Sequence, residues 1–242
     1  MRINSPPGRM LLMGNSAPFN QPFKALPGLV ALWPMQNNAA LLDISGNAHN
    51  LAQHGSVTFG QAVGGGLYSH KLAAAYWNAA DDVWNSITGA LFIAGWINHD
   101  GNAAAQETYL AKWTSAGDQR CYALYRTNTG LLQWTVTALG TSASLIGIAS
   151  LGAFTTGWTF VAGRYIPSTS VSNWINTTKA NNTTTIPASL PDGTGAIEVG
   201  SWNGGASGMV GNMGVLGLYN IAPSDAAVLA LYNTTKGFYI NP

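Results

Sequence analysis

Carboxylate side chains are the residues of this chain best suited to acid–base chemistry, and they are few. The 242 residues include two glutamates, Glu107 and Glu198, which lie far apart and have no acidic companion at short spacing. Glycoside hydrolysis needs two carboxyl groups flanking one bond. Asp81 and Asp82 are adjacent, so a strand would point them to opposite faces, and we expect them in a loop. We expect Glu198 at a sheet edge or on an exposed face, and we predict that the protein is not an enzyme.

Motifs for metals, nucleophiles and phosphate are weak. No histidine pair has i, i+4 spacing or a nearby cysteine, so the sequence does not indicate zinc. The histidines are predicted to be solvated loop residues: His49, His54, His70 and His99. The stretch "VGGGLY" (63–68) lacks the lysine of a phosphate-binding loop. The single cysteine, Cys121, alternates with Ala123 and Tyr125, which predicts a small buried apolar group.

Aromatic rings near predicted loop ends are the better candidates for binding, because a flat aromatic face can pack against the apolar face of a sugar ring. Two short stretches, "YWNAADDVWN" (76–85) and "SWNGG" (201–205), hold these rings beside polar residues. The candidate ligand-binding residues are Trp77, Asp81, Asp82, Trp84, Trp202 and Asn203. The tryptophans within strand patterns are predicted to be core or sheet-face residues instead: Trp33, Trp96, Trp134, Trp158 and Trp174.

Composition limits the partners of the chain. Only 8% of residues are charged and the formal net charge is +1, so the sequence predicts no basic surface for nucleic acid. No apolar run approaches the roughly 20 residues that cross a bilayer, and no membrane partner is expected. The start "MRINSPPGRMLLMGNS" has an apolar run too short for a signal peptide, so export by that route is not expected.

The pattern of apolar residues predicts one domain between two appendages. Residues 1–27 contain five prolines and no hydrophobic period, which indicates an extended arm that lies outside a packed core. Short strand patterns separated by turn residues follow, and "ALFIAGWIN" (90–98) is apolar on both faces, so we expect it mid-sheet with a cover on each side. "PSDAAVLALYN" (223–233) predicts one helix with Ser224 as its N-cap, placed over an open edge or end of the sandwich. Residues 234–242 are expected to form a tail.

The order of these segments resembles the laminin G-like family of concanavalin A-type lectin and glucanase folds. The resemblance rests on "GLVALWPM", "DISGNAHNL", "FIAGWIN", "YLAKWTSAGDQRCYALYRT", "GWTFVAGRY", "AIEVGSW" and "GVLGLYNIAPSDAAVLALYN", and it covers about residues 28–233. It implies an all-β jelly roll of two antiparallel sheets with a short C-terminal helix. The arm has no family counterpart, and Asn176 is followed by a Thr/Asn-rich loop where the family has an Asn-Gly turn.

Some members of this family bind calcium, and Asp43 in "DISGN" resembles a recurrent acidic position of the family. The resemblance therefore implies a possible calcium site at Asp43 and Asn47. The alternative is that Asp43 and Ser45 organise a turn through side-chain hydrogen bonds, with Gly46 at positive φ. The sequence favours the turn.

Three hypotheses for function remain. The leading one is a non-enzymatic structural or attachment protein of a large assembly, most consistent with a bacteriophage virion component such as a capsid decoration or tail-fibre protein. In this hypothesis the arm contacts other subunits, and the chain is a homo-oligomer or part of a larger complex in the virion. The alternative is a carbohydrate-binding module that recognises a surface glycan through loop aromatics. A degenerate glucanase is the third.

Overall fold

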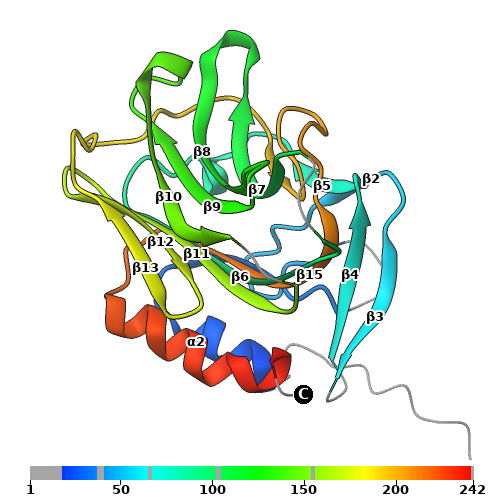
Figure 1. The fold of residues 1–242 in the computed structure, drawn as a ribbon. Coiled ribbons are helices and arrows are strands. Elements are labelled where there is room, and N and C mark those ends of the chain that lie inside the picture. The colour runs from blue at the N-terminus through cyan, green and yellow to red at the C-terminus, as the bar shows by residue number, and fades with distance from the viewer. Residues whose placement is uncertain (1–17, 37–40, 65–66, 102–104, 154–155, 241–242) are drawn as a thin grey trace, which may run out of the picture.

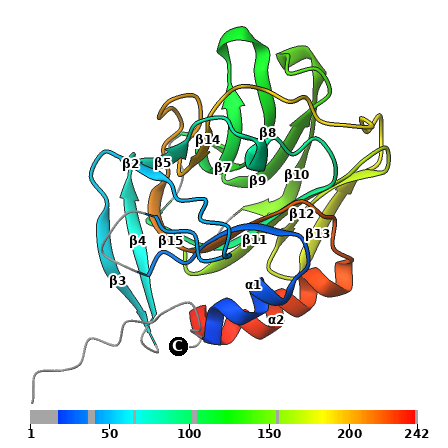
Figure 2. The ribbon, with the colours of Figure 1, turned by 180° about the vertical axis from the view of Figure 1, so that it is seen from behind.

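The structure, a computed structural model, describes residues 18–36, 41–64, 67–101, 105–153 and 156–240. Within these ranges the strands form two antiparallel sheets that pack face to face, with a helical layer outside one of them (Figures 1 and 2). The predicted all-β sandwich with a C-terminal helix is confirmed. The helical segments are η1 (Pro18–Asn20), α1 (Gln21–Ala25), η2 (Val83–Asn85), η3 (Ala116–Asp118), η4 (Ser142–Ser144) and α2 (Asp225–Tyr239).

The larger sheet has eight strands in the described residues, in the order β13-β12-β11-β6-β15-β4-β3, and β1 also pairs with β15. Its strands are β1 (Leu29–Trp33), β3 (Thr58–Gly64), β4 (Leu67–Ala73), β6 (Leu91–His99), β11 (Thr159–Ile166), β12 (Ser170–Ile175), β13 (Thr178–Asn182) and β15 (Val210–Tyr219). The smaller sheet has the order β10-β9-β8-β7-β14-β5-β2. Its strands are β2 (Ala52–His54), β5 (Tyr76–Ala79), β7 (Glu107–Thr114), β8 (Gln119–Arg126), β9 (Leu131–Thr137), β10 (Leu145–Ala153) and β14 (Ile197–Val199).

Strand β6 shows why the fold has three layers. Ile93 and Ile97 point between the two sheets into the main core, and Phe92 and Trp96 point the other way, toward the helices. Side chains alternate along a strand, so a strand that is apolar at every position needs cover on both faces. The prediction that residues 90–98 are covered on both sides is confirmed.

Helix α2 supplies that outer cover, and two expectations about it are wrong. Ser224 is its N-cap as predicted, but the helix continues to Tyr239, so residues 234–239 are not a tail. The helix also lies across the outer face of the larger sheet and not over an open end: the rings of Trp96 and Tyr239 stack at 4.8 Å. Burial of Tyr239, whose hydroxyl accepts a hydrogen bond from the Val215 amide at 3.1 Å, outweighs the weak helix propensity of "NTTKG".

The N-terminal segment also departs from the expectation. Residues 18–25 are helical, and Phe19 and Phe23 are buried in the same outer core as α2. The Tyr219 hydroxyl donates a hydrogen bond to the Phe23 carbonyl at 2.9 Å. The predicted extended arm is therefore wrong for these residues, because aromatic burial on the chain's own domain offsets the cost of ordering them. Residues 1–17, the rest of the predicted arm, lie outside the described residues.

Among the described residues, none of the helices has the length and apolar character that crossing a membrane requires.

Candidate ligand-binding groove

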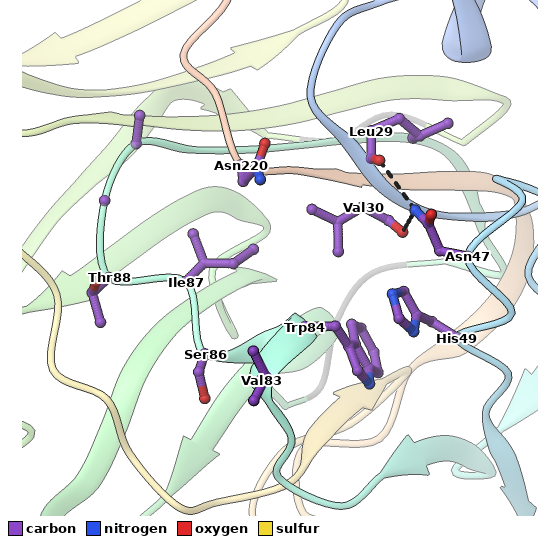
Figure 3. A pocket seen from close by; sticks show the side chains of 12 residues that line it. Leu29, Val30, Asn47, His49, Val83, Trp84, Ser86, Ile87, Thr88 and Asn220 are labelled. Carbon is purple, nitrogen blue, oxygen red and sulfur yellow. Dashed lines mark hydrogen bonds between the residues drawn. The ribbon is translucent and has the colours of Figure 1, made fainter.

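A hollow of about 480 Å³ lies where β1 and β6 begin and β15 ends (Figure 3). Two loops frame it, one at residues 43–50 and one at residues 81–90, and we call it the groove. None of the residues that line it is Asp, Glu, Lys or Arg. They are Leu29, Val30, Asn47, His49, Val83, Trp84, Ser86, Ile87, Thr88, Gly89, Ala90 and Asn220.

Asp43 holds the first loop in place with its carboxylate. Oδ1 accepts hydrogen bonds from the amides of Leu32 and Ser45, both at 2.8 Å. Oδ2 accepts from the Ser45 hydroxyl at 2.7 Å and from the His49 amide at 2.9 Å. Gly46 has a φ of 107°, as the sequence predicts. The turn prediction for Asp43 and Ser45 is confirmed, and one carboxylate ties β1 to the backbone of His49.

Two further hydrogen bonds anchor this loop to β1. Asn47 Nδ2 donates to the Val30 carbonyl at 2.8 Å, a bond visible in Figure 3. Trp33 Nε1 donates to the His49 carbonyl at 2.9 Å. Ala48, between these two anchored residues, has a φ of 59°, which is unusual for a residue with a Cβ. The anchors hold His49 at the wall of the groove.

His49 and Trp84 form that wall together. Their rings stack with centroids 4.3 Å apart and planes 9° apart. Figure 3 shows the two side chains next to each other. Trp84 also contacts Trp33 in an edge-to-face arrangement, at a centroid distance of 6.4 Å. Val83, beside Trp84 at the rim, is 89% exposed. The wall is thus a half-buried aromatic pair with an exposed apolar tip next to it.

The second loop is held from beneath by a buried cation. Lys112 of β7 is 1% exposed, and its ammonium donates to Asn85 Oδ1 at 2.8 Å, to Ser86 Oγ at 3.3 Å and to Asp81 Oδ1. Asp82 caps η2, since its Oδ1 accepts from the Val83 amide at 2.6 Å. Asp81 and Asp82 therefore position the loop and do not line the groove, so their prediction as ligand contacts is not supported by the geometry.

Of the two neighbouring tryptophan candidates, only one faces the groove. Trp84 lines it, whereas Trp77 of β5 is fully buried in the main core. The prediction of Trp77 as a ligand contact is wrong, because β5 turns that side chain inward between the sheets.

Trp202 belongs to a separate group on the outer face of the smaller sheet, here called the outer aromatic cluster: Trp113, Tyr125 and Trp202. Trp202 stacks on Trp113 with centroids 5.3 Å apart and planes 14° apart, and it contacts Tyr125 at 5.1 Å. Asn203 Oδ1 accepts a hydrogen bond from the Ser115 amide at 2.8 Å. One face of Trp202 is therefore covered by protein, and Asn203 is used to fix its own loop.

Glu198 holds the loop that carries Trp202. It is 2% exposed and accepts hydrogen bonds from the Ser201 hydroxyl and from the amides of Gly204, at 2.7 Å, and Gly205, at 3.3 Å. The expectation of an edge or exposed position for Glu198 is wrong. A buried carboxylate is tolerated here because backbone and hydroxyl donors surround it.

Glu107 sits in a different buried network. Its Oε2 lies 3.2 Å from Arg126 Nη1 and 2.8 Å from His99 Nδ1. His99 Nε2 lies 2.8 Å from the Tyr109 hydroxyl. Burial raises the pKa of the Tyr109 hydroxyl well above its usual value. The two glutamates thus serve separate structural networks and do not form an acid–base pair.

The residues present do not fit calcium at Asp43 and Asn47. All four hydrogen bonds to the Asp43 carboxylate come from protein donors, and the Asn47 side chain directs its N–H groups at carbonyls of β1. A calcium ion needs several oxygen atoms with free lone pairs. Among the described residues, no group of three or more His, Cys, Asp or Glu side chains is arranged to hold a metal ion.

Sequence reasoning missed the two residues that complete the groove with Trp84. His49 was expected to be solvated, yet it is half buried against Trp84; His70 and His99 are buried, so the same expectation is wrong for them. Asn220 enters the groove from the end of β15. No local pattern marks either residue, because each acquires its role from a contact with a distant segment.

Comparison with known proteins supports the fold. No protein-family model matches the chain, and no curated protein matches it. Solved structures do match. For the binding domain of botulinum neurotoxin DC in complex with rat synaptotagmin II, the TM-score is 0.65 at 13% identity, over 86% of this chain and 52% of that chain. For the binding domain of Paraclostridial Mosquitocidal Protein 1, the TM-score is 0.67 at 14% identity, over 88% and 53%.

A third similar structure concerns botulinum neurotoxin type C, whose cell entry is described as dependent on interaction with two ganglioside molecules. Its TM-score is 0.60 at 14% identity, over 86% of this chain and 51% of that chain. The chain therefore spans about half the length of the chains it matches. At such low identity the likeness shows the fold alone, a jelly-roll sandwich of two antiparallel sheets, and the finer resemblance to laminin G-like lectin domains stays a prediction.

Proposed function

We propose that this protein is a non-enzymatic binding module that recognises a saccharide in the groove. The observation that carries the proposal is the stacked pair of His49 and Trp84 beside a hollow lined by amides, hydroxyls and apolar side chains. A sugar ring has an apolar face and a polar edge, so an aromatic wall next to hydrogen-bonding groups complements it.

The fold comparisons are consistent with this role. Two of the similar structures described above are binding domains, and the third concerns a toxin whose cell entry is stated to depend on gangliosides. Because this chain corresponds to only about half of each, the ligands of those proteins do not transfer to it residue by residue. The groove itself is the reason for the proposal, and the comparisons lend it context.

The test is an array of immobilised glycans probed with the labelled full-length protein, followed by titration with the best soluble glycan. Trp84→Ala is expected to weaken binding by at least about 10-fold, the loss of about 1.4 kcal/mol that one stacked ring contributes. The matched control is Trp202→Ala, which removes a ring of equal size from the outer aromatic cluster and is expected to leave the affinity unchanged.

The opposite result, loss of binding in Trp202→Ala with Trp84→Ala unaffected, would move the site to the outer aromatic cluster. Trp84 also contacts Trp33, so circular dichroism of each variant must accompany the titration. Should Trp84→Ala unfold, Trp84→Leu keeps apolar volume against Trp33 and removes the aromatic face.

We also propose the finer assignment that the sequence favours, a structural or attachment protein of a large assembly such as a phage virion. What supports it is the low charge, with 8% of residues charged, and the segment at residues 1–17, which holds two of the five prolines of the predicted arm. A glycan-binding groove suits an attachment role. Since residues 18–25 belong to the core, the informative variant lacks residues 1–17 only.

Sedimentation of that variant beside the full-length chain tests the assembly role. Assembly of the full-length chain alone would support a role of residues 1–17 in contacts between subunits. Identical monomers in both samples would count against it and leave the saccharide proposal standing.

A further inference from the structure

We infer that the groove selects uncharged saccharides and rejects their anionic counterparts. This inference rests on the proposed function and adds the class of ligand. The polar groups that line the groove are the amides of Asn47 and Asn220, the hydroxyls of Ser86 and Thr88, and the His49 imidazole. None of them offers the fixed positive charge that normally pairs with a carboxylate, sulfate or phosphate on a ligand.

Apart from the His49 imidazole, the ionisable side chains of the two framing segments are carboxylates, which have the wrong sign for an anion. The framing segments "LLDISGNAHNL" (41–51) and "ADDVWNSITGA" (80–90) contain three aspartates and neither lysine nor arginine. Asp82, in particular, is exposed at the base of the rim residue Val83. An anionic sugar would lose hydration without gaining an ionic partner, close to carboxylates of the same charge.

The cation nearest to the second loop cannot serve an anionic ligand. Lys112 is 1% exposed, and its ammonium is held by Asp81, Asn85 and Ser86 below the groove. The positive charge that holds this loop is thus enclosed by the loop itself. The groove presents neutral donors and acceptors, which hydrogen-bond sugar hydroxyls without a charge.

The experiment titrates the full-length protein with pairs of oligosaccharides that share a core and differ by one anionic group, such as lactose and its 3′-sulfate ester, chosen to include the best array hits. It is done at about pH 8, where histidine side chains are ordinarily neutral. The neutral member is expected to bind at least about 10-fold more tightly. Its Kd is expected to change less than about twofold between about 0.05 and about 0.5 M salt, since no ionic contact is screened.

A substitution at the rim of the groove tests the same inference by adding a positive charge. Val83→Lys places a cation at a position that is 89% exposed, so the fold should persist. This variant is expected to lower the ratio of the charged member's Kd to the neutral member's Kd several-fold. The matched control Val83→Thr is expected to leave that ratio unchanged.

Tighter binding of the charged member by the unaltered protein, or a strong salt dependence, would overturn this inference and leave the proposed function standing. Binding of no saccharide on the array or in titration would overturn both.

A separate observation, the enclosed ammonium, assigns Lys112 as the positioning residue of the groove. Its ammonium bonds to Asp81, Asn85 and Ser86, the residues on either side of Val83 and Trp84. Without it, the Asp81 carboxylate and the Asn85 amide oxygen lose a shared donor, and the loop has no partner from β7 at this point. Trp84 then keeps its contacts with His49 and Trp33, but the loop that carries it loses its tie to β7.

The test separates positioning from stability. Saccharide affinity of Lys112→Met is measured well below its unfolding midpoint, where the variant is folded, and a Kd raised about 10-fold is expected. Lys112→Arg, which keeps the charge, is expected to recover most of the affinity. An unchanged Kd in folded Lys112→Met would overturn the assignment.

If Lys112→Met does not fold, Asp81→Ala tests the same assignment of Lys112 as a positioning residue. It removes one of the three partners of the ammonium from a side chain that is 31% exposed. A Kd raised several-fold in that variant supports the assignment, and an unchanged Kd contradicts it.

Discussion

The groove and the outer aromatic cluster are both held by charged side chains within hydrogen-bond networks, and they end in opposite states. At the cluster, the Glu198 carboxylate holds the loop that carries Trp202. At the groove, the Asp43 carboxylate holds the loop that carries His49, and the Lys112 ammonium holds the loop that carries Trp84. At the cluster, the ring of Trp202 stacks on the ring of Trp113. At the groove, Trp84 stacks on a smaller ring, His49, beside an open hollow.

The comparison teaches that a tryptophan near a loop end is not enough to mark a binding site. Whether a tryptophan can bind a ligand depends on the surface that remains uncovered once hydrogen bonds have fixed its loop. The cluster uses its tryptophan to cover Ala111 and Ala123 of the smaller sheet. The groove brings together two loops and the end of β15 around a space, and the predictions that follow test this difference, from the largest expected effect to the smallest.

Asp43→Ala should have the largest effect. It removes the acceptor of four hydrogen bonds and leaves the His49 amide without its partner. We expect a loss of about 2–4 kcal/mol in the free energy of unfolding, measured with urea, and no measurable saccharide binding. The control is Asp192→Ala at an exposed position, for which both quantities should stay unchanged. Unchanged saccharide affinity in Asp43→Ala would contradict the role of Asp43 in holding the groove.

Glu198→Gln applies the same change to the other region. One accepting oxygen becomes an NH2 group, which cannot accept. Either the Ser201 hydroxyl and the Gly205 amide, or the Gly204 amide, therefore lose their acceptor. We expect a loss of about 1–2 kcal/mol in the free energy of unfolding with saccharide affinity unchanged. Reduced affinity in this variant would show that the two regions are coupled and that the comparison fails.

Asn220→Ala probes the rim of the groove more gently. The residue is exposed, and its amide is placed to reach a ligand hydroxyl. We expect affinity to fall about 3- to 10-fold, the usual range for one neutral hydrogen bond, with the unfolding midpoint unchanged. Titration calorimetry checks the affinity, and an unchanged Kd would remove Asn220 from the site.

The ion pairs at the start of α2 lie outside both regions and should have the smallest effect. A hydrogen bond from Lys179 and the charge of Arg164 lower the pKa of the Asp225 carboxyl. The folded-state pKa lies below the unfolded value, so this stabilisation is present above about pH 4 and is lost as the pH falls through the lowered pKa. Because Asp225 is 57% exposed, we expect Asp225→Asn to lose less than about 1 kcal/mol at neutral pH.

The measurement is the free energy of unfolding in urea, determined for Asp225→Asn and for the unaltered protein, at neutral pH and near pH 2. The difference between them should vanish at the acid end, and saccharide affinity at neutral pH should be equal. A difference that persists in acid would mean that the carboxylate charge is not its source.

The fold was largely predictable because it depends on short-range patterns. The run at residues 90–98, which is apolar on both faces, predicted the mid-sheet strand. Ser224, as an N-cap residue, predicted the start of α2. The ends of elements were not predictable where burial overrides propensity: Phe19, Phe23 and Tyr239 are held by tertiary contacts that no local pattern reveals.

The candidate site was predictable only in part. Asp43 was assigned its turn correctly because that role is local, and Trp84 was chosen for its place near a loop end. Trp77 was wrongly chosen with it, because "YWNA" is too short for alternation to show which side chain points inward. Residues far along the chain complete the site: His49 stacks on Trp84, Asn220 lines the same groove, and Lys112 bonds to residues on either side of Val83 and Trp84. Such long-range relations leave no periodic signal in the sequence.

The most direct test of the central claim follows the indole N–H signals of the protein by nuclear magnetic resonance during titration with the best saccharide from the array. Trp84 and Trp202 are assigned by comparison with Trp84→Ala and Trp202→Ala. If the groove is the site, the Trp84 signal moves with saccharide concentration along a binding isotherm and the Trp202 signal stays in place. Movement of the Trp202 signal with Trp84 unmoved would contradict the account and place binding at the outer aromatic cluster.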